Sequence, residues 1–215
     1  MKRLNKFLAE SGMASRRGAD KLILENKVLV NGKVAKLGDK VSERDRVVVN
    51  GQEINKAEEK EYFSVYKPVG YVSTANDEWG RPKVTDLVNS KNRLYPVGRL
   101  DKNSEGLMIL TNDGELTLRL THPRYHLEKE YEVETDRKID FKKINTGQNK
   151  IIWRDGNKMK IIMYEGKKRQ IRNMCWEAGL RVKKLKRVRM GKLVLGNMEA
   201  GEVRRLGQKE IKELI

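Results

Sequence analysis

The first side chain whose type and position could do chemistry is Asp101, an aspartate in a loop before an apolar segment. It follows Gly98, Arg99 and Leu100 and precedes a polar turn and the apolar run 106–110, which predicts a buried strand. Catalytic and binding residues are often held in this way, in a loop before a rigid strand. The pattern is equally typical of an aspartate that caps a turn or pairs with Arg99, and the local sequence leaves both interpretations open.

Two other side chains are candidates for the same chemistry. Tyr131 lies in the segment 128–135, where apolar and charged residues alternate, which predicts a half-buried strand with Tyr131 pointing inward. Arg172 lies off the apolar stripe of a helix predicted over 169–178. By pattern alone, Tyr131 fits an ordinary core tyrosine and Arg172 fits a charged helix face.

Turn and cap signals predict the elements around these residues. Asn112, Asp113 and Gly114 form a turn, and Asp113 can cap a helix over 115–120 whose three leucines, at 116, 118 and 120, give a short apolar face. Nearer the N-terminus, the spacing of apolar residues predicts a helix over 3–10 and a second one capped by Ser15. Asn-Gly pairs at 31–32 and 50–51 each predict a hairpin turn.

The chain is strongly basic. Its 215 residues include 47 Lys and Arg against 30 Asp and Glu, a net charge of +17, which favours a polyanionic partner such as RNA, DNA or an acidic membrane surface. Charge alone does not choose among these partners, and it also fits a simple solubility or thermophile signature. The hydrophobic content of 38% predicts a globular chain with room for one medium domain and a small module.

Several classes of protein are disfavoured by composition. The single cysteine, Cys175, excludes an intramolecular disulfide and is predicted to lie in the core, and the two histidines, His122 and His126, have no metal-site spacing. No metal is therefore expected. No apolar run approaches the roughly 18 residues of a membrane span, and the N-terminus has no cleavable leader pattern. We expect a cytoplasmic, unprocessed protein.

Longer motifs give a specific resemblance. The segment 98–101 reads GRLD and is followed by SEG, LTNDGEL and THPR, with Lys129 and Tyr131 in a K-x-Y pattern downstream. These motifs, with YKPVG at 66–70 and EGKKRQIRNM at 165–174, are similar to those of the RsuA/RluB-type ribosomal RNA pseudouridine synthase family. The resemblance implies an α+β fold whose catalytic domain has a mixed, mainly antiparallel sheet flanked by helices.

A second resemblance covers the N-terminal part of the chain. Residues 1–53 resemble the S4 RNA-binding domain through the helix pair and the hairpins, so we expect this domain, a linker over 54–60 and the catalytic domain over 61–215. Cations in both domains are predicted to contact RNA phosphates. The predicted RNA-binding residues are Arg16, Arg17, Lys21, Lys67, Arg99, Arg169, Lys184 and Lys186.

The resemblance also implies roles for the three candidate residues. Asp101 is the expected catalytic carboxylate, Arg172 its ion-pair partner, and Tyr131 the aromatic ring that packs on the target uracil. Conversion of uridine to pseudouridine involves no redox change and no group donor, so no cofactor is expected. The carboxylate can act as a covalent nucleophile or as a base at the 2′ carbon, and the sequence does not distinguish these courses.

The chain departs from the family pattern in two places. Tyr66 stands where asparagine usually precedes the lysine of the first motif, and the region 136–158 is shorter than in other members. We expect a monomer that modifies ribosomal RNA or ribosomal precursor particles, with large-subunit RNA preferred over small-subunit RNA. The alternative that the shortened region motivates is a non-catalytic RNA-binding protein of ribosome assembly. A DNA-binding protein ranks lower, because it leaves Asp101, Tyr131 and Arg172 without a role.

Overall fold

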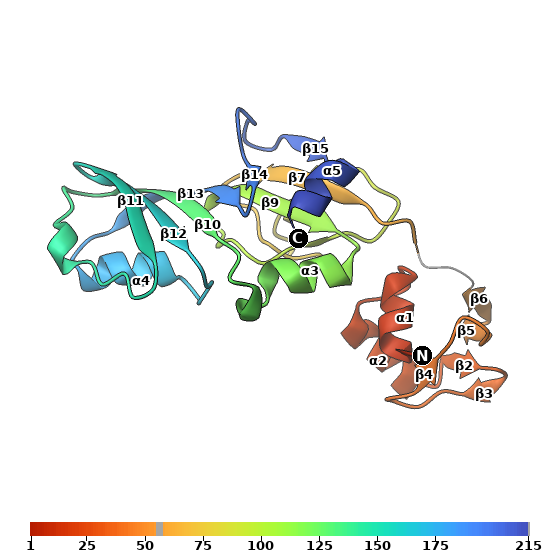
Figure 1. The fold of residues 1–215 in the computed structure, drawn as a ribbon. Coiled ribbons are helices and arrows are strands. Elements are labelled where there is room, and N and C mark those ends of the chain that lie inside the picture. Colours follow the sequence, from red (N-terminus) through yellow and green to blue (C-terminus); the bar gives the residue numbers. More distant parts are fainter. Residues whose placement is uncertain (55–57, 215) are drawn as a thin grey trace. The chain divides into compact units, whose positions relative to one another are not determined.

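The chain forms two compact units in the structure, a computed structural model that describes residues 1–54 and 58–214 (Figure 1). The first unit contains residues 1–61 and 91–93, and the second contains residues 62–90 and 94–215. The predicted linker, residues 54–60, includes residues 55–57, which lie outside the described residues, so its extent stays a prediction. Within the part of the chain that is described, no helix combines the length and the apolar character that crossing a membrane requires.

The first unit packs two helices against short strands. Its core comes from apolar side chains of both helices and of the strands, including Leu4, Leu8, Ile23, Val28 and Val47. The helices are α1 (Leu4–Glu10) and α2 (Arg16–Leu24); β3 (Lys33–Val34), β2 (Val28–Val30), β5 (Val47–Val49) and β6 (Gln52–Ile54) pair in that order, and β1 (Lys2–Arg3) pairs with β4 (Lys40–Val41).

Local signals in this unit are confirmed. The hydroxyl of Ser15 accepts a hydrogen bond from the backbone N–H of Gly18 and caps α2. Asn31 has a φ of 51° and joins β2 to β3, and Asn50 has a φ of 49° and joins β5 to β6. Both positions have the left-handed backbone that a tight Asn-Gly hairpin turn requires.

The second unit is built on a mixed, mainly antiparallel sheet. Among the described residues, its strands pair in the order β11-β12-β10-β13-β9-β7-β15, β14 pairs with β13, and β8 pairs with β9. All pairs are antiparallel except β9 with β13. The strands are β7 (Tyr62–Lys67), β8 (Tyr95–Pro96), β9 (Glu105–Thr111), β10 (Lys129–Thr135), β11 (Lys150–Asp155), β12 (Lys158–Met163), β13 (Val182–Met190), β14 (Leu193–Val194) and β15 (Val203–Arg205).

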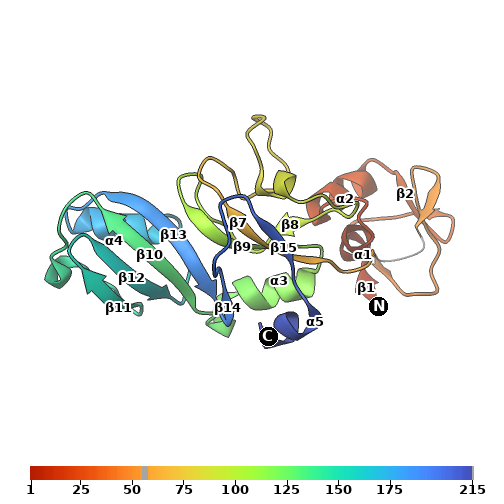
Figure 2. The ribbon, with the colours of Figure 1, turned by 90° about the horizontal axis from the view of Figure 1, so that it is seen from above.

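Strand β9 separates two hydrophobic cores. Met108 and Leu110 face one core, whereas Leu107 and Ile109 face the other, as the period of two in a strand requires. The first core contains α4 (Gln170–Glu177) and the second contains α3 (Gly114–Thr121) and α5 (Gln208–Glu213). In Figure 2, α4 lies at the left with β10 to β13, whereas α3 and α5 lie near β9 and β15. Both faces of β9 are thus covered, which explains its uninterrupted apolar run.

The helix predicted after Asp113 is confirmed, with one correction. The Asp113 carboxylate accepts hydrogen bonds from the backbone N–H groups of Glu115 and Leu116, and α3 begins at Gly114. Leu116 and Leu120 are buried, but Leu118 is exposed, because it lies on the opposite side of the helix. The 3-10 turns η1 (Val84–Leu87), η2 (Pro123–Tyr125) and η3 (Phe141–Lys143) complete the unit.

Gly106 has a backbone that only glycine can supply at the parallel contact between β9 and β13. Its φ is +107°, and a Cβ atom there would lie 2.2 Å from the backbone oxygen of Arg187. We expect Gly106→Ala to lower the free energy of unfolding by about 3 kcal/mol or more, because strain and overlap with backbone add. Urea unfolding would measure the loss.

Gly166→Ala is the matched control for this prediction. A Cβ atom at Gly166 meets nothing within 4 Å, and no strained φ is recorded there. The control should unfold within about 0.5 kcal/mol of the wild type. Equal stability of the two variants would show that β9 and β13 do not approach each other as closely as described.

Candidate active site

The loop that carries Asp101 is fixed by hydrogen bonds from the preceding motif. The hydroxyl of Ser73 accepts from the backbone N–H of Leu100 and donates to its carbonyl oxygen, at 3.0 and 2.7 Å. The backbone N–H of Gly70 donates to the carbonyl oxygen of Lys102 at 2.8 Å. Gly70 in the YKPVG motif and Ser73, three residues after it, therefore support the loop on both sides of Asp101, as a preorganised site requires.

Arg172 links this loop to α4. Its guanidinium donates to the carbonyl oxygens of Asn103 and Val182, at 2.7 and 3.0 Å, and to the hydroxyl of Ser104 at 3.3 Å. The remaining nitrogen, Nε, is buried without a hydrogen-bond partner among the described residues and lies 4.0 Å from the Asp101 carboxylate. Arg172 is 11% exposed and Asp101 33% exposed. Burial, followed by the charge of Arg169, lowers the pKa of Arg172.

Arg169 brings a second guanidinium to the same carboxylate. Its Nη1 lies 3.9 Å from Asp101, and its backbone is left-handed, with φ of 54° and ψ of 28°. The helix was predicted to begin at Arg169 but begins at Gln170, because Arg169 has this non-helical backbone as its N-cap. Two arginines thus lie within 4.0 Å of one carboxylate.

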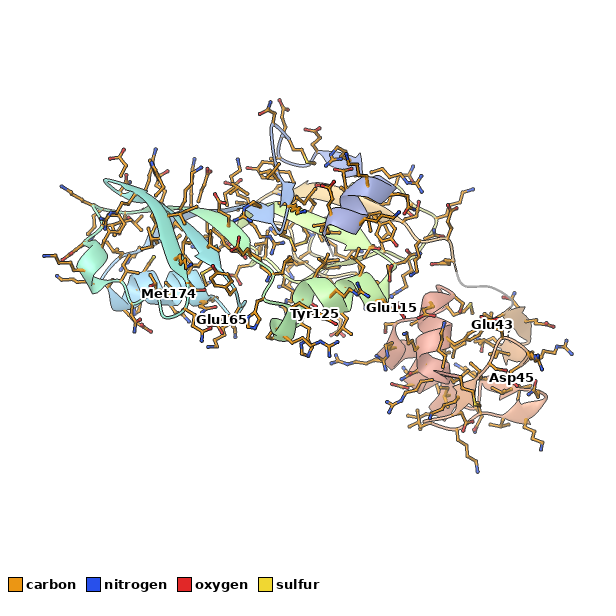
Figure 3. The ribbon with its side chains drawn as sticks, viewed as in Figure 1. Glu43, Asp45, Glu115, Tyr125, Glu165 and Met174 are labelled. Atoms are coloured by element: carbon orange, nitrogen blue, oxygen red, sulfur yellow. The ribbon has the colours of Figure 1, made fainter. Side chains whose placement is uncertain are left out.

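A cleft of about 940 Å³ opens beside Asp101. Its walls come from the loops around residues 72–81 and 99–104, from the start of α4 and from strands β10, β12 and β13. Tyr131 on β10 is a buried residue that lines the cleft. Figure 3 labels Glu165, another lining residue, just before α4, and Met174 within the helix. The charged residues that line the cleft are Asp77, Glu78, Arg81, Arg99, Asp101, Lys102, Glu165, Lys167, Lys168 and Arg169.

The chain matches known proteins over its whole length. Residues 61–177 match the RNA pseudouridylate synthase family, and residues 2–47 match the S4 domain. The chain belongs to the RNA pseudouridylate synthase family. This pseudouridine synthase is 39% identical to ribosomal large subunit pseudouridine synthase B of Bacillus subtilis, over 100% of the chain and 96% of the relative. It is also 39% identical to the dual-specificity RNA pseudouridine synthase RluF of Escherichia coli, over 99% of the chain and 78% of the relative.

A solved structure supports the fold. A crystal structure of a pseudouridylate synthase superposes with a TM-score of 0.71 at 29% identity, and each chain is covered to 100%. The family and the α+β fold class that the motifs predict are therefore confirmed. The roles of individual residues in this synthase stay predictions, and the structure shows only where each side chain lies.

The predicted RNA-binding residues fall in three places. Arg99 and Arg169 are exposed and line the cleft of the synthase beside Asp101. Lys184 and Lys186 alternate with Leu185 on β13; Leu185 lines the cleft, whereas the two lysines line a second hollow, with Tyr66 and Trp153, on the other face of the sheet. Arg16, Arg17 and Lys21 are exposed on α2 of the first unit.

The structure corrects the prediction for Lys67. It was predicted to contact RNA, but its side chain is 0% exposed, and its ammonium donates to the carbonyl oxygen of Pro68 at 2.7 Å. Burial lowers the pKa of Lys67 to about 8; the charge of Glu105 opposes this shift, and that of Arg187 adds to it. A side chain in this position cannot reach a phosphate, because β7 directs it into the interior.

The burial of Lys67 makes stability depend on pH. Between about 8 and 10.5 the unfolded side chain binds a proton that the folded one lacks, so the free energy of unfolding rises with pH in this window. Below about pH 8 the folded protein carries a buried charge at Lys67, so we expect Lys67→Met to raise the free energy of unfolding there by about 2 kcal/mol. The increase of the free energy of unfolding between about pH 8 and 10.5 should be smaller in this variant than in the wild type. Urea unfolding at about pH 7.5 and about pH 9.5 tests this.

The control for this prediction is Lys138→Met, a change at an exposed lysine. It should leave the pH dependence as in the wild type. Lys129 has a pKa that burial also lowers to about 8, so part of the rise should survive in Lys67→Met. An unchanged rise in Lys67→Met would contradict the assignment.

Sequence reasoning missed two residues that hold the site. Ser73 bonds both backbone groups of Leu100, and the buried Ser104 accepts from Arg172. A lone serine in a polar loop carries no signal of such a role. Tyr66, the departure from the first motif, donates to the Glu105 carboxylate at 3.1 Å and packs in the second core. Its side chain therefore lies on the face of the sheet opposite Tyr131.

Proposed function

We propose that this synthase converts specific uridines of ribosomal RNA to pseudouridine, with large-subunit RNA as its substrate in preference to small-subunit RNA. The observation that carries the proposal is the Asp101 carboxylate between two guanidinium groups in a cleft that Tyr131 also lines. The names of the relatives in Bacillus subtilis and Escherichia coli support the choice of substrate class.

The reaction matches what the site contains. The N1–C1′ bond of uridine breaks, the base rotates, and a C5–C1′ bond forms; C5 loses a proton and N1 of the product carries one. No electrons or groups are exchanged with a second molecule. Asp101 serves either as a nucleophile on the nucleoside or as a base at the 2′ carbon, and both courses need its ionised form. The two arginines place positive charge beside this carboxylate, at 3.9 and 4.0 Å.

The target uridine must leave its stack to reach Asp101. Tyr131 provides an aromatic wall that offsets the lost stacking of the uracil, and its hydroxyl is a candidate relay for the C5 proton. Arg99 is exposed at the cleft, where it either fills the space that the uridine vacates or binds a phosphate. Greater loss of binding than of turnover in Arg99→Ala would favour the phosphate contact.

The first unit adds affinity in this proposal. Arg16, Arg17 and Lys21 displace counterions from the RNA backbone, so binding should weaken as salt rises. The synthase acts as a monomer in the cytoplasm, on ribosomal RNA or on precursor particles.

Mapping pseudouridines with carbodiimide tests the function. In vitro transcripts of the large- and small-subunit ribosomal RNAs of the source organism, which lack modifications, are incubated with the wild-type chain and then probed by reverse transcription. We expect a new site in the large-subunit transcript. A site in the small-subunit transcript alone would correct the substrate. Salt-sensitive binding without any product would favour the assembly-protein alternative.

A further inference from the structure

An indole ring stands in solvent at the wall of the catalytic cleft. Trp79 is 81% exposed, although it is one of the largest apolar side chains in the chain. It lines the same cleft as Asp101 and Tyr131. Among the described tryptophans, Trp79 is thus the one whose exposed ring is available to a ligand in this cleft.

Hydrogen bonds to Asp77 hold the loop that carries Trp79. The Asp77 carboxylate accepts from the backbone N–H groups of Trp79 and Arg81, at 3.1 and 2.8 Å, and from Nε and Nη2 of Arg81, at 3.1 and 2.6 Å. The hydrogen bonds from Arg81 lower the pKa of Asp77 to about 2, so these contacts persist at neutral pH. Binding therefore costs little ordering of this loop.

The base of the loop is closed as well. The backbone N–H of Val72 donates to the carbonyl oxygen of Pro82 at 2.9 Å, and the N–H of Val84 donates to the carbonyl oxygen of Val72 at 3.0 Å. The Thr74 hydroxyl accepts a hydrogen bond from the backbone N–H of Asn76 and donates one to the carbonyl oxygen of Asn76. The loop thus presents Trp79 on a rigid support, which suits a preorganised recognition element.

The surroundings of Trp79 identify the class of ligand. Lining side chains such as Arg99, Lys102 and Lys168 are cationic and exposed, which fits a phosphate backbone running through the cleft. An exposed indole beside cationic side chains is a platform on which an RNA base stacks. Trp176 and Trp153 differ, because neither lines this cleft.

We propose that Trp79 is a specificity-determining residue whose indole stacks on an unpaired base of the substrate RNA, beside the uridine that enters the cleft. The inference rests on the proposed function. It predicts that the synthase selects RNAs that present an unpaired base near the target, and that Trp79 reads the presence of that base rather than its identity, because every base has a face that stacks.

The test measures binding and single-turnover rates of the full-length chain on a hairpin that contains the mapped uridine. We expect Trp79→Ala to raise the Kd about tenfold and to change the saturating rate less than about threefold. Trp79→Phe should restore most of the affinity. Trp176→Ala, which removes another exposed indole, should bind as the wild type does.

Abasic substitutions in the hairpin decide whether a base is read. Replacing one unpaired nucleotide by an abasic residue should weaken binding by the wild type about tenfold, as Trp79→Ala does. The same replacement should not weaken binding by Trp79→Ala any further. Wild-type affinity in Trp79→Ala overturns the proposal. Equal penalties from every abasic residue in both proteins overturn it too, since Trp79 would then act only through the protein.

A fluorescence measurement keeps this result separate from the proposed function. In a Trp153→Phe/Trp176→Phe variant, Trp79 is the remaining indole, and RNA that stacks on it should quench its emission. If the wild type makes no pseudouridine, the large-subunit transcript serves as the probe, and the Kd of Trp79→Ala is compared on it. Quenching of the Trp79 emission by RNA, together with weaker binding by Trp79→Ala, supports the stacking contact without catalysis; unquenched emission at saturating RNA overturns it.

Discussion

Asp101→Asn is expected to reduce pseudouridine formation by at least about 10³-fold, because both chemical courses require an ionised carboxylate at this position. The amide has the same shape but cannot attack carbon or remove a proton. The contacts that hold the loop, from Ser73 to Leu100 and from Gly70 to Lys102, use backbone groups beside Asp101 and not its carboxylate. The variant should therefore fold and keep its RNA affinity within about threefold of the wild type.

Single-turnover rates on the mapped RNA, with Kd values from the same preparation, measure this effect. Asp155→Asn is the matched control: Asp155 is an exposed aspartate on β11 and does not line the cleft. It should react as the wild type does. Full product formation by Asp101→Asn would show that another group performs the chemistry. Loss of RNA affinity as large as the loss of rate would assign Asp101 to binding.

The elements around the site were predictable because their signals are local. The uninterrupted apolar run of β9 and the alternation of Tyr131 and Val133 in β10 follow from what each strand packs against. The cap at Asp113 needs only residues two and three positions away. Such signals survive in one sequence, since burial pattern and capping depend on neighbours in the chain.

The assembly of the site was not predictable from pattern alone. Arg172 reaches the carbonyl oxygens of Asn103 and Val182, which lie far from one another in the sequence. No periodicity specifies that these segments meet; strand pairing does so, through the parallel contact of β9 with β13. The motif resemblance supplied the pair Asp101 and Arg172, whereas the backbone contacts that position it appear only in three dimensions.

Charges were the least predictable feature. The basic run 183–189 predicts a strand, and β13 confirms it, but periodicity does not say which face borders the cleft. Lys184 and Lys186 lie on the face away from it, and Arg187 is almost fully buried with Nε donating to the carbonyl oxygen of Leu107 at 2.7 Å. A cation is expected at the surface by default, so a buried one is found only when its acceptor is known.

Arg172→Lys is expected to lower both stability and rate. Lysine keeps the charge but lacks the planar fork, so it cannot donate to Asn103 and Val182 while also facing Asp101. At least one of the two carbonyl oxygens loses its charge-assisted hydrogen bond, which should lower the free energy of unfolding by about 2 kcal/mol. The single-turnover rate should fall about 10²-fold, because the loop that carries Asp101 is no longer tied to α4.

Urea unfolding and single-turnover kinetics measure the two effects, with Arg181→Lys as the control. Arg181 is an exposed arginine outside the cleft, and its guanidinium packs over Trp176. A double-mutant cycle of Arg172→Lys with Asp101→Asn then isolates the ion pair. At 4.0 Å, and with no hydrogen bond from Nε among the described residues, the ion pair should contribute less to stability than the bonds to backbone do. A coupling energy equal to the whole loss of stability in Arg172→Lys would contradict this expectation, because Arg172 would then stabilise the fold through the carboxylate alone.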